Sequence, residues 1–189
     1  SDGVSVIAQA SAPEAISNLT IIEEIDDWTL SWSYVYMPTD FKTFQIYQDY
    51  DLIGETSGLV FKAKITKTQS NFRVIAVDTA GNQSTYTQQT VTITPLNDIA
   101  SVNASYLNNN ILMFWDKIST NKTPIFYEVK KSSSWENAQF IEKTTDYKLN
   151  IFSNGTYMIK ATYQYSSGLK IESENPKILI VDEAQLLKN

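Results

Sequence analysis

Acidic side chains are the groups in this sequence best suited to chemistry, and they occur in close pairs. Two pairs lie at 23–24 and 26–27, and Asp49 and Asp51 flank a tyrosine further along. Paired carboxylates are used in glycoside hydrolysis and in calcium binding. These pairs coincide with expected turns, however, and none has the spacing of a calcium-binding loop. We therefore interpret them as solvated turn charges.

Histidine and cysteine are both absent from the 189 residues. Without cysteine there is no disulfide, no thiolate metal site and no cysteine nucleophile. Without histidine the chain lacks the commonest general base and the commonest metal ligand, and a Ser-His-Asp triad is excluded. We predict that the protein is not an enzyme and that it has no catalytic, cofactor-binding or metal-binding residues and no cofactor.

The charge and hydropathy of the chain argue against nucleic acid binding and membrane insertion. The formal net charge is −6, and the nearest approach to a basic cluster is the single pair Lys130-Lys131. Nucleic acid recognition needs a basic face. The longest apolar run, residues 111–115, is too short to cross a bilayer. The chain begins with neither a signal-peptide pattern nor an initiator methionine, so we interpret it as part of a larger protein.

The elements that must position these residues are short strands. Runs rich in Val, Ile, Thr, Tyr, Phe and Trp alternate with turn residues along the whole chain, and helical periodicity is nearly missing. Many short strands separated by turns indicate a β-sandwich or a barrel. The expected strands are 18–24, 27–34, 44–50, 59–65, 71–78, 85–93, 104–108, 111–116, 126–131, 146–152, 156–165 and 176–182.

Three apolar patterns recur in the second half of the chain in the same order, which indicates two copies of one domain. "TLSW", ending at Trp32, recurs as "LMFW", ending at Trp115, 83 residues later. The aromatic-x-aliphatic strands and the "FRVIAV" and "YMIKAT" strands match at offsets of 83 and 85. We place the seam near 94–98, where Pro95 ends the last strand. Because so few residues separate the copies, we expect a stiff connection.

Residues that recur on one parity of matched strands are the predicted structural core. In each copy the side chains of a strand alternate between two faces, and the matched residues share the apolar face. Trp28 shares this parity but has Ile111 as its counterpart and lies at the start of its strand, so we expect it at the rim of the sandwich. The predicted core residues are Trp32, Phe44, Ile46, Phe72, Val74, Trp115, Tyr127, Val129, Tyr157 and Ile159.

These features resemble tandem fibronectin type III domains over residues 14–94 and 97–181. The resemblance implies an all-β fold of two tandem immunoglobulin-like β-sandwiches. It also implies a corner hydrogen bond from the tyrosine that begins the sixth strand, which Tyr157 can make and Phe72 cannot. The family's proline at that corner is replaced by Ser153. The expected division is a leader at 1–13, domains at 14–95 and 96–182, and the start of a downstream element at 183–189.

A narrower resemblance is to modules in tail-tip proteins of long-tailed bacteriophages, the host-specificity or central tail-fibre proteins. It is carried by "LIGETSGLVF", "VIAVDTAGNQS" and "YEVKKSSSWENAQFIEKT…NGTYMIKAT". It implies a structural spacer of a phage or prophage virion tail, whose partners are other tail domains or subunits and, through neighbouring domains, a host receptor. The alternatives are an extracellular adhesion or carbohydrate-binding tandem module and an accessory region of a secreted bacterial hydrolase.

Three apolar residues are candidates for an interface. Leu112 and Phe114 fall on the outward parity of a strand whose counterpart in the first copy carries threonine and serine there. An apolar outer face suggests cover by a subunit, a domain or a local loop. Trp135 lies in a stretch, 132–139, that has a capping-box pattern and predicts a helical turn. We expect Trp135 to fold back over the edge of the sandwich, with an exposed ligand-binding tryptophan as the alternative.

The last residues predict a short helix. Asp182 is well placed to cap it, and Glu183 would lie in its first turn, where the helix dipole favours acid. Its apolar side chains cannot be buried by so short a piece, so we expect residues 183–189 to begin an element of the next domain and to be partly ordered.

Overall fold

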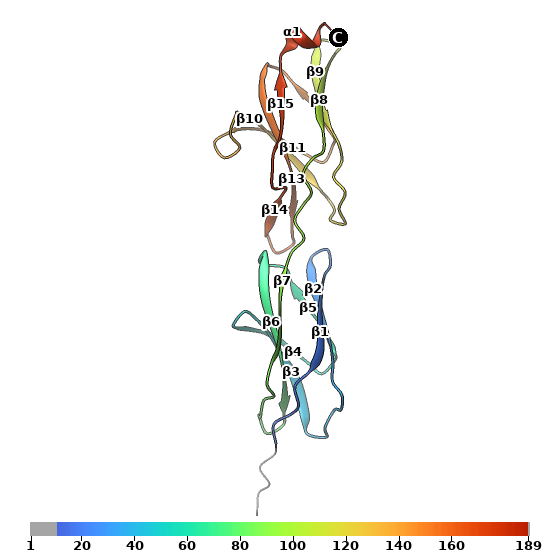
Figure 1. Cartoon of the computed structure of the whole chain (residues 1–189), viewed down its shortest axis with the longest axis vertical. Helices are drawn as coiled ribbons and strands as arrows, with labels where there is room; N and C mark the ends of the chain where they lie inside the picture. Colours follow the sequence, from blue (N-terminus) through green and yellow to red (C-terminus); the bar gives the residue numbers. More distant parts are fainter. Residues whose placement is uncertain (1–10, 189) are drawn as a thin grey trace, which may run out of the picture. The chain divides into compact units, whose positions relative to one another are not determined.

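The computed structural model describes residues 11–188, which form fifteen strands and one short helix (Figure 1). None of the helical structure in this part of the chain is long and apolar enough to cross a membrane. The chain divides into two compact units between Ile93 and Thr94, which we call unit 1 and unit 2. Most of the predicted leader, residues 1–10 of 1–13, lies outside the described residues.

Unit 1 is a sandwich of two antiparallel sheets with the orders β1-β2-β5 and β4-β3-β6-β7. Aromatic side chains meet between the layers. The ring centroids of Trp32 and Phe44 are 5.3 Å apart, and those of Trp28 and Phe72 are 6.4 Å apart. The strands are β1 (Ser17–Glu23), β2 (Asp27–Ser33), β3 (Phe41–Gln48), β4 (Asp51–Thr56), β5 (Val60–Lys64), β6 (Gln69–Asp78) and β7 (Thr87–Thr92).

Strand β2 shows why the sequence folds this way. Trp28, Leu30 and Trp32 are buried, whereas Thr29 and Ser31 between them are half-buried on the outer face, as a period-2 pattern requires. The expectation that Trp28 covers the rim is wrong, because its side chain is only 2% exposed. Strand β5 extends one residue past Trp28 and β1 ends directly opposite it, so Trp28 has a paired neighbour on each side.

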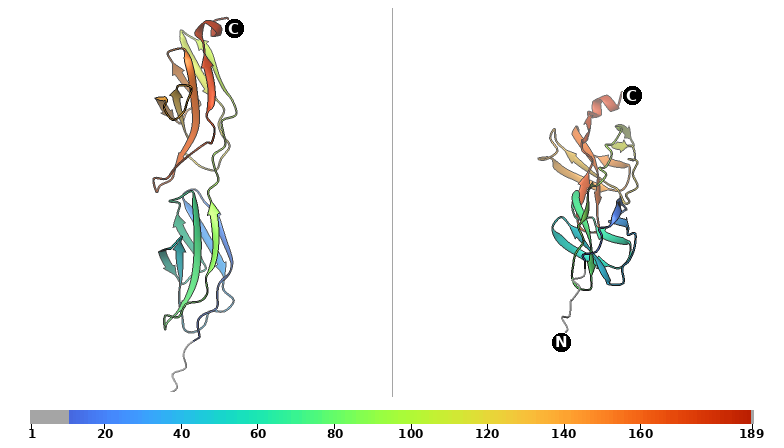
Figure 2. Two further views of the ribbon diagram at one scale, coloured as in Figure 1. Left: turned by 60° about the vertical axis from the view of Figure 1, so that its left-hand side comes forward. Right: turned by 60° about the horizontal axis from the view of Figure 1, so that its bottom comes forward.

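Unit 2 repeats this plan with the sheets β12-β9-β8 and β11-β10-β13, and both β14 and β15 pair with β13. In Figure 2 the yellow-green strands β8 and β9 form a layer separate from the orange strands. The prediction of two tandem immunoglobulin-like β-sandwiches is confirmed. The strands are β8 (Val102–Leu107), β9 (Asn110–Trp115), β10 (Phe126–Lys131), β11 (Gln139–Thr144), β12 (Lys148–Ile151), β13 (Gly155–Gln164), β14 (Lys170–Glu172) and β15 (Lys177–Val181).

Three strands, β4, β11 and β14, have no counterpart among the strands expected from the sequence. All three lie at the edge of a sheet. Their side chains are mostly exposed or half-buried, so they show little of the apolar alternation that predicts a strand. Short, polar edge strands are also a common protection against edge-to-edge association.

The connecting turns use residues that tolerate positive φ. Asn108 and Asn109, with φ of 49° and 62°, join β8 to β9 in a two-residue hairpin, which suits the twist of antiparallel strands. Residues 78–82 form a turn after β6, in which the Asp78 carboxylate accepts the side-chain and backbone N–H groups of Asn82, each at 2.8 Å. The hydrogen bond from the Asn82 side chain is the main cause of a lowered pKa of Asp78.

The tyrosine corner is present in unit 2 and replaced in unit 1. The Tyr157 hydroxyl donates to the Ser153 carbonyl at 2.8 Å, which confirms the implied hydrogen bond. Phe72 occupies the equivalent position of unit 1 and cannot donate. There the equivalent carbonyl, that of Thr68, accepts the backbone N–H of Ile93 at 2.9 Å. The two copies therefore pair the same corner carbonyl with different donors.

The predicted helix at the end of the chain is α1 (Glu183–Leu186). Asp182 is its N-cap, and its carboxylate accepts the N–H of Ala184 at 3.0 Å. Glu183 lies in the first turn and donates its own N–H to the side chain of Asn154 at 2.8 Å. These contacts tie the start of the helix to unit 2. The idea that it begins a downstream element stays a prediction.

Candidate functional site

The predicted core residues all lie inside the two sandwiches. Trp32 and Trp115 are each 5% exposed, and their rings pack against an aromatic side chain of the opposite sheet: Phe44 in unit 1 and Tyr127 in unit 2. The side chains are therefore occupied with packing and present no surface to a ligand. The other members of the set, each no more than 2% exposed, are Phe44, Ile46, Phe72, Val74, Tyr127, Val129, Tyr157 and Ile159.

The acidic pairs are spread over the surface of unit 1 and do not converge. Three of the carboxylates are paired with lysines: Lys62–Glu24 (2.7 Å), Lys64–Asp27 (3.0 Å) and Lys67–Asp49 (2.6 Å). Exposed ion pairs of this kind contribute little to stability. Among residues 11–188, no three acidic side chains gather in a way that could hold a metal ion.

Leu112 and Phe114 lie on the outer face of strand β9, half-buried and 40% exposed respectively. Their cross-strand neighbours are polar: Ser105 and Asn150 beside Leu112, Asn103 and Lys148 beside Phe114. In unit 1 the central residues, Thr29 and Ser31, are polar, and each has one polar neighbour and one exposed apolar neighbour, Ile22 or Val60. The outer face of each unit thus carries apolar side chains among polar ones. The difference between the outward residues of β2 and those of β9 therefore gives no separate argument for a partner.

The segment around Trp135 is a turn and not the predicted helix. Residues 132–138 form bends and a single turn between β10 and β11. The seven residues between the strands close a hairpin, in which bends and one turn replace the predicted helical turn. The Trp135 ring folds back over the outer face of the sheet, with Lys130 Nζ 4.2 Å and Lys160 Nζ 5.4 Å from its centroid.

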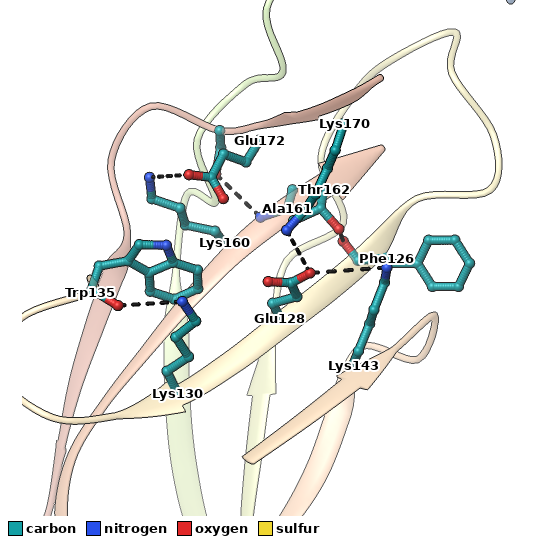
Figure 3. A network of polar contacts seen from close by, with 11 residues as sticks. Phe126, Glu128, Lys130, Trp135, Lys143, Lys160, Ala161, Thr162, Lys170 and Glu172 are labelled. Carbon is teal, nitrogen blue, oxygen red and sulfur yellow. Dashed lines mark hydrogen bonds and ion pairs between the residues drawn. The ribbon is translucent and has the colours of Figure 1, made fainter. Parts of the chain in front are cut away.

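A network of charges lies beneath and beside this ring, on β10, β11, β13 and β14 (Figure 3). Glu128, with a side chain 11% exposed, contacts Lys170 at 2.8 Å and Lys143 at 4.0 Å. Lys160, with a side chain 9% exposed, contacts Glu172 at 3.3 Å. Buried charges are costly unless they are paired, and both of these are paired.

Lys130 and Lys143 of this network each contact both an aromatic ring and an oxygen atom. Lys130 Nζ donates to the Trp135 carbonyl at 3.3 Å in addition to lying over its ring. Lys143 Nζ lies 4.7 Å from the Phe126 ring centroid as well as near Glu128. Cation–π contacts of this kind restrain the loop that carries Trp135. The arrangement anchors the loop to the sheet, which is the expected role of Trp135 and leaves its ring half-buried.

A second aromatic cluster, which was not predicted from the sequence, lies on the outer face of unit 1. The guanidinium of Arg73 on β6 lies 5.3–5.7 Å from the ring centroids of Tyr47, Tyr50 and Tyr86. Its Nη2 donates to the Asp49 carbonyl at 2.7 Å. An available signal was the parity of "NFRVIAV", which places Arg73 opposite the core residues on either side of it. The three tyrosines come from other segments of the chain, so no sequence pattern relates them to Arg73.

Comparison with known proteins gives a likeness of architecture at low identity. No family model matches the chain, and no curated protein matches it. Solved structures similar to it include the chicken interferon gamma receptor alpha chain, at 16% identity and a TM-score of 0.39, covering 90% of this chain and 99% of that one. A segment of two fibronectin type III domains from chicken tenascin is similar at 13% identity and a TM-score of 0.38, covering 88% and 99%. At such scores the strand pairing, and not these matches, carries the assignment of the fold.

Proposed function

We propose that the chain is a non-enzymatic structural segment of a phage or prophage tail-tip protein, where it spaces host-recognition parts and takes part in assembly. The observation that supports this most directly is the tandem arrangement of two complete sandwiches. Strand β7 ends at Thr92 and β8 begins at Val102, and each unit has its own core. Repetition of a self-sufficient domain extends a chain without needing a ligand.

The connector between the strands is well fixed to unit 2, which suits a spacer. Asn97 donates its side-chain N–H to the Ser119 carbonyl at 2.9 Å. The Asp98 carboxylate accepts the side-chain and backbone N–H groups of Asn175, both at 2.9 Å. These hydrogen bonds, from the side chain first, lower the pKa of Asp98.

The sequence resemblance to phage tail-tip modules supplies the biological setting of the proposal. It is densest over residues 127–162, which include the loop of Trp135 and its lysine anchors. In that setting the partners are other domains or subunits of the tail, and the protein is located in the virion. An extracellular adhesion module or an accessory region of a secreted hydrolase would use the same two sandwiches in another place.

Immunogold electron microscopy tests the proposal. Antibodies raised against residues 11–188 are applied to particles purified from the source of the gene and, separately, to its cells and culture supernatant. Labelling at the distal end of phage tails is the expected result, and the reading frame around this segment should encode tail-hub domains. Labelling confined to the cell surface, or to a secreted enzyme whose frame carries a catalytic domain, would refute it.

A further inference from the structure

The outer face of the larger sheet in unit 1 carries an open hollow of about 440 Å³. That volume is within the usual range for small-molecule sites. The hollow lies over the Arg73 cluster, on the opposite side of the sheet from the core. It is lined by Asp49, Tyr50, Asn71, Arg73, Tyr86 and Gln88.

Three neighbouring strands position these residues. The two-residue turn between β3 and β4 places Asp49 at a φ of 58° and projects Tyr50, which is 88% exposed. Strand β6 supplies Arg73, which is paired across the sheet with Gln88 of β7. Tyr86, 54% exposed, immediately precedes β7. The hollow therefore has a floor of planar polar groups and two accessible aromatic rings.

The guanidinium of Arg73, at the centre of the hollow, already has interaction partners within unit 1. Arg73 is surrounded by three tyrosine rings and is hydrogen bonded to the Asp49 carbonyl, which fixes the guanidinium and the rings against it. A cationic ligand would have to displace an arginine that occupies the aromatic cage. Positively charged ligands are therefore disfavoured at this site.

The single carboxylate of the lining is also committed. Asp49 binds Lys67 Nζ at 2.6 Å and the Asn71 N–H at 3.0 Å. The hydrogen bond from Lys67 is the main cause of its lowered pKa. Lys67 adds a second positive charge and Asp51, which acts on Lys67, a second negative one, so the charges of Asp49, Asp51, Arg73 and Lys67 sum to zero. A neutral ligand with many hydroxyls fits this balance better than an ion does.

We propose that this hollow binds a neutral pyranose unit of a glycan. Tyr50 would stack against the C–H face of the sugar ring, and Gln88 and the tyrosine hydroxyls would hydrogen bond with its hydroxyls. Exposed tyrosines provide both an apolar ring and a polar tip, and a few oriented polar groups supply specificity. This activity adds to the spacing function and does not depend on it.

Heteronuclear NMR titration of the chain with methyl glycosides and short oligosaccharides of glucose, galactose, mannose and N-acetylglucosamine, each up to about 10 mM, tests the proposal. The expected result is saturable shifts of the amides at 49–50, 71–73 and 86–88 with at least one neutral sugar. Tyr50→Ala should weaken binding about tenfold, the upper part of the range for loss of one aromatic contact. Tyr36→Ala is the matched control, because Tyr36 is an exposed tyrosine of the same unit outside the hollow.

Three results would overturn the proposal. The first is the absence of shifts at these amides with every sugar of the panel. The second is binding that Tyr50→Ala leaves unchanged or that Tyr36→Ala weakens equally. The third, checked by titrating a sialic acid and a uronate in the same way, is binding restricted to these acidic sugars, since the charges around the hollow cancel. None of these outcomes depends on where immunogold places the protein.

Discussion

Replacing Trp32 tests the core of unit 1 and, with its counterpart Trp115, the independence of the two units. The Trp32 ring is 5% exposed and lies between the sheets against Phe44, which is fully buried. Truncation to alanine leaves a cavity that the fixed sheets cannot close. The typical cost of Trp→Ala or Phe→Ala at such a site is about 3–5 kcal/mol. A domain of this size has about 5–15 kcal/mol in total, so Trp32→Ala should remove a large part of it.

A second substitution separates ring packing from the indole N–H. Within residues 11–188, neither Trp32 Nε1 nor Trp115 Nε1 has a hydrogen-bond partner, and both atoms are buried. An unpaired buried donor costs about 1–3 kcal/mol. Trp32→Phe removes this donor while keeping a six-membered ring against Phe44. Removing the unpaired donor stabilises the folded state, whereas the smaller ring loses part of the packing. Because these two effects oppose one another, we expect Trp32→Phe to cost less than about 2 kcal/mol, well below the cost of Trp32→Ala.

Urea denaturation followed by resolved NMR amide signals of each unit measures these differences. Trp32→Ala should lower the midpoint of unit 1 and leave that of unit 2 nearly unchanged, and Trp115→Ala should do the reverse. Trp135→Ala is the control, because its half-buried ring lies on the outer face of the sheet and its loss should cost about 1 kcal/mol or less in cation–π energy. An unchanged midpoint of unit 1 in Trp32→Ala would refute the core assignment. Equal losses for alanine and phenylalanine would refute the argument about the N–H.

Three further changes test separate contacts. Tyr157→Phe removes the corner hydrogen bond and should destabilise unit 2 by about 0.5–1.5 kcal/mol, measured by urea denaturation; no loss would mean that the corner carbonyl finds water at no cost. Gly54→Ala places a methyl group 2.6 Å from the Phe61 ring and should cost about 1–3 kcal/mol through overpacking, whereas Gly54→Ala with Phe61→Leu should recover part of it. The pKa of Asp78 is lowered by Asn82, so its contribution is present above the usual aspartate pKa of about 3.9 and is lost as the pH falls through the lower folded value. Unit 1 of Asp78→Ala should therefore differ most from the parent protein near neutral pH, and a difference that grows in acid would contradict this.

The strands most readily predicted from the sequence are those that bury one face. In β2 and β9, and in the apolar runs of β6 and β13, alternation of apolar and polar residues is strong because core packing imposes it residue by residue. The cap at Asp182 was predictable from the residues because its partner lies two positions away, and the hydrogen bond of the corner tyrosine was implied by the resemblance to fibronectin type III domains. The edge strands were not predicted, because little of their surface is buried and their apolar alternation is weak.

The Trp135 loop shows where local pattern fails. Its capping-box residues favour a helical turn in isolation, but β10 and β11 are fixed in one sheet and the loop must close a hairpin. The ring is then held by Lys130 and Lys160, which lie on different strands of that sheet. No spacing in the sequence relates these two lysines, because their proximity arises from strand pairing.

The fold class, the repeat and the buried face of most strands can be predicted from the sequence, because a period of two fixes which side chains share a face. Which outward residues become neighbours depends on the folded structure. Tyr50, Arg73 and Tyr86 come from a turn, a central strand and the start of an edge strand, and the order β4-β3-β6-β7 brings them together. The same limit applies to the lysines around Trp135. Outward positions carry no burial constraint, so their sequence pattern is weak, and their arrangement depends on strand order and register, which nonlocal pairing sets.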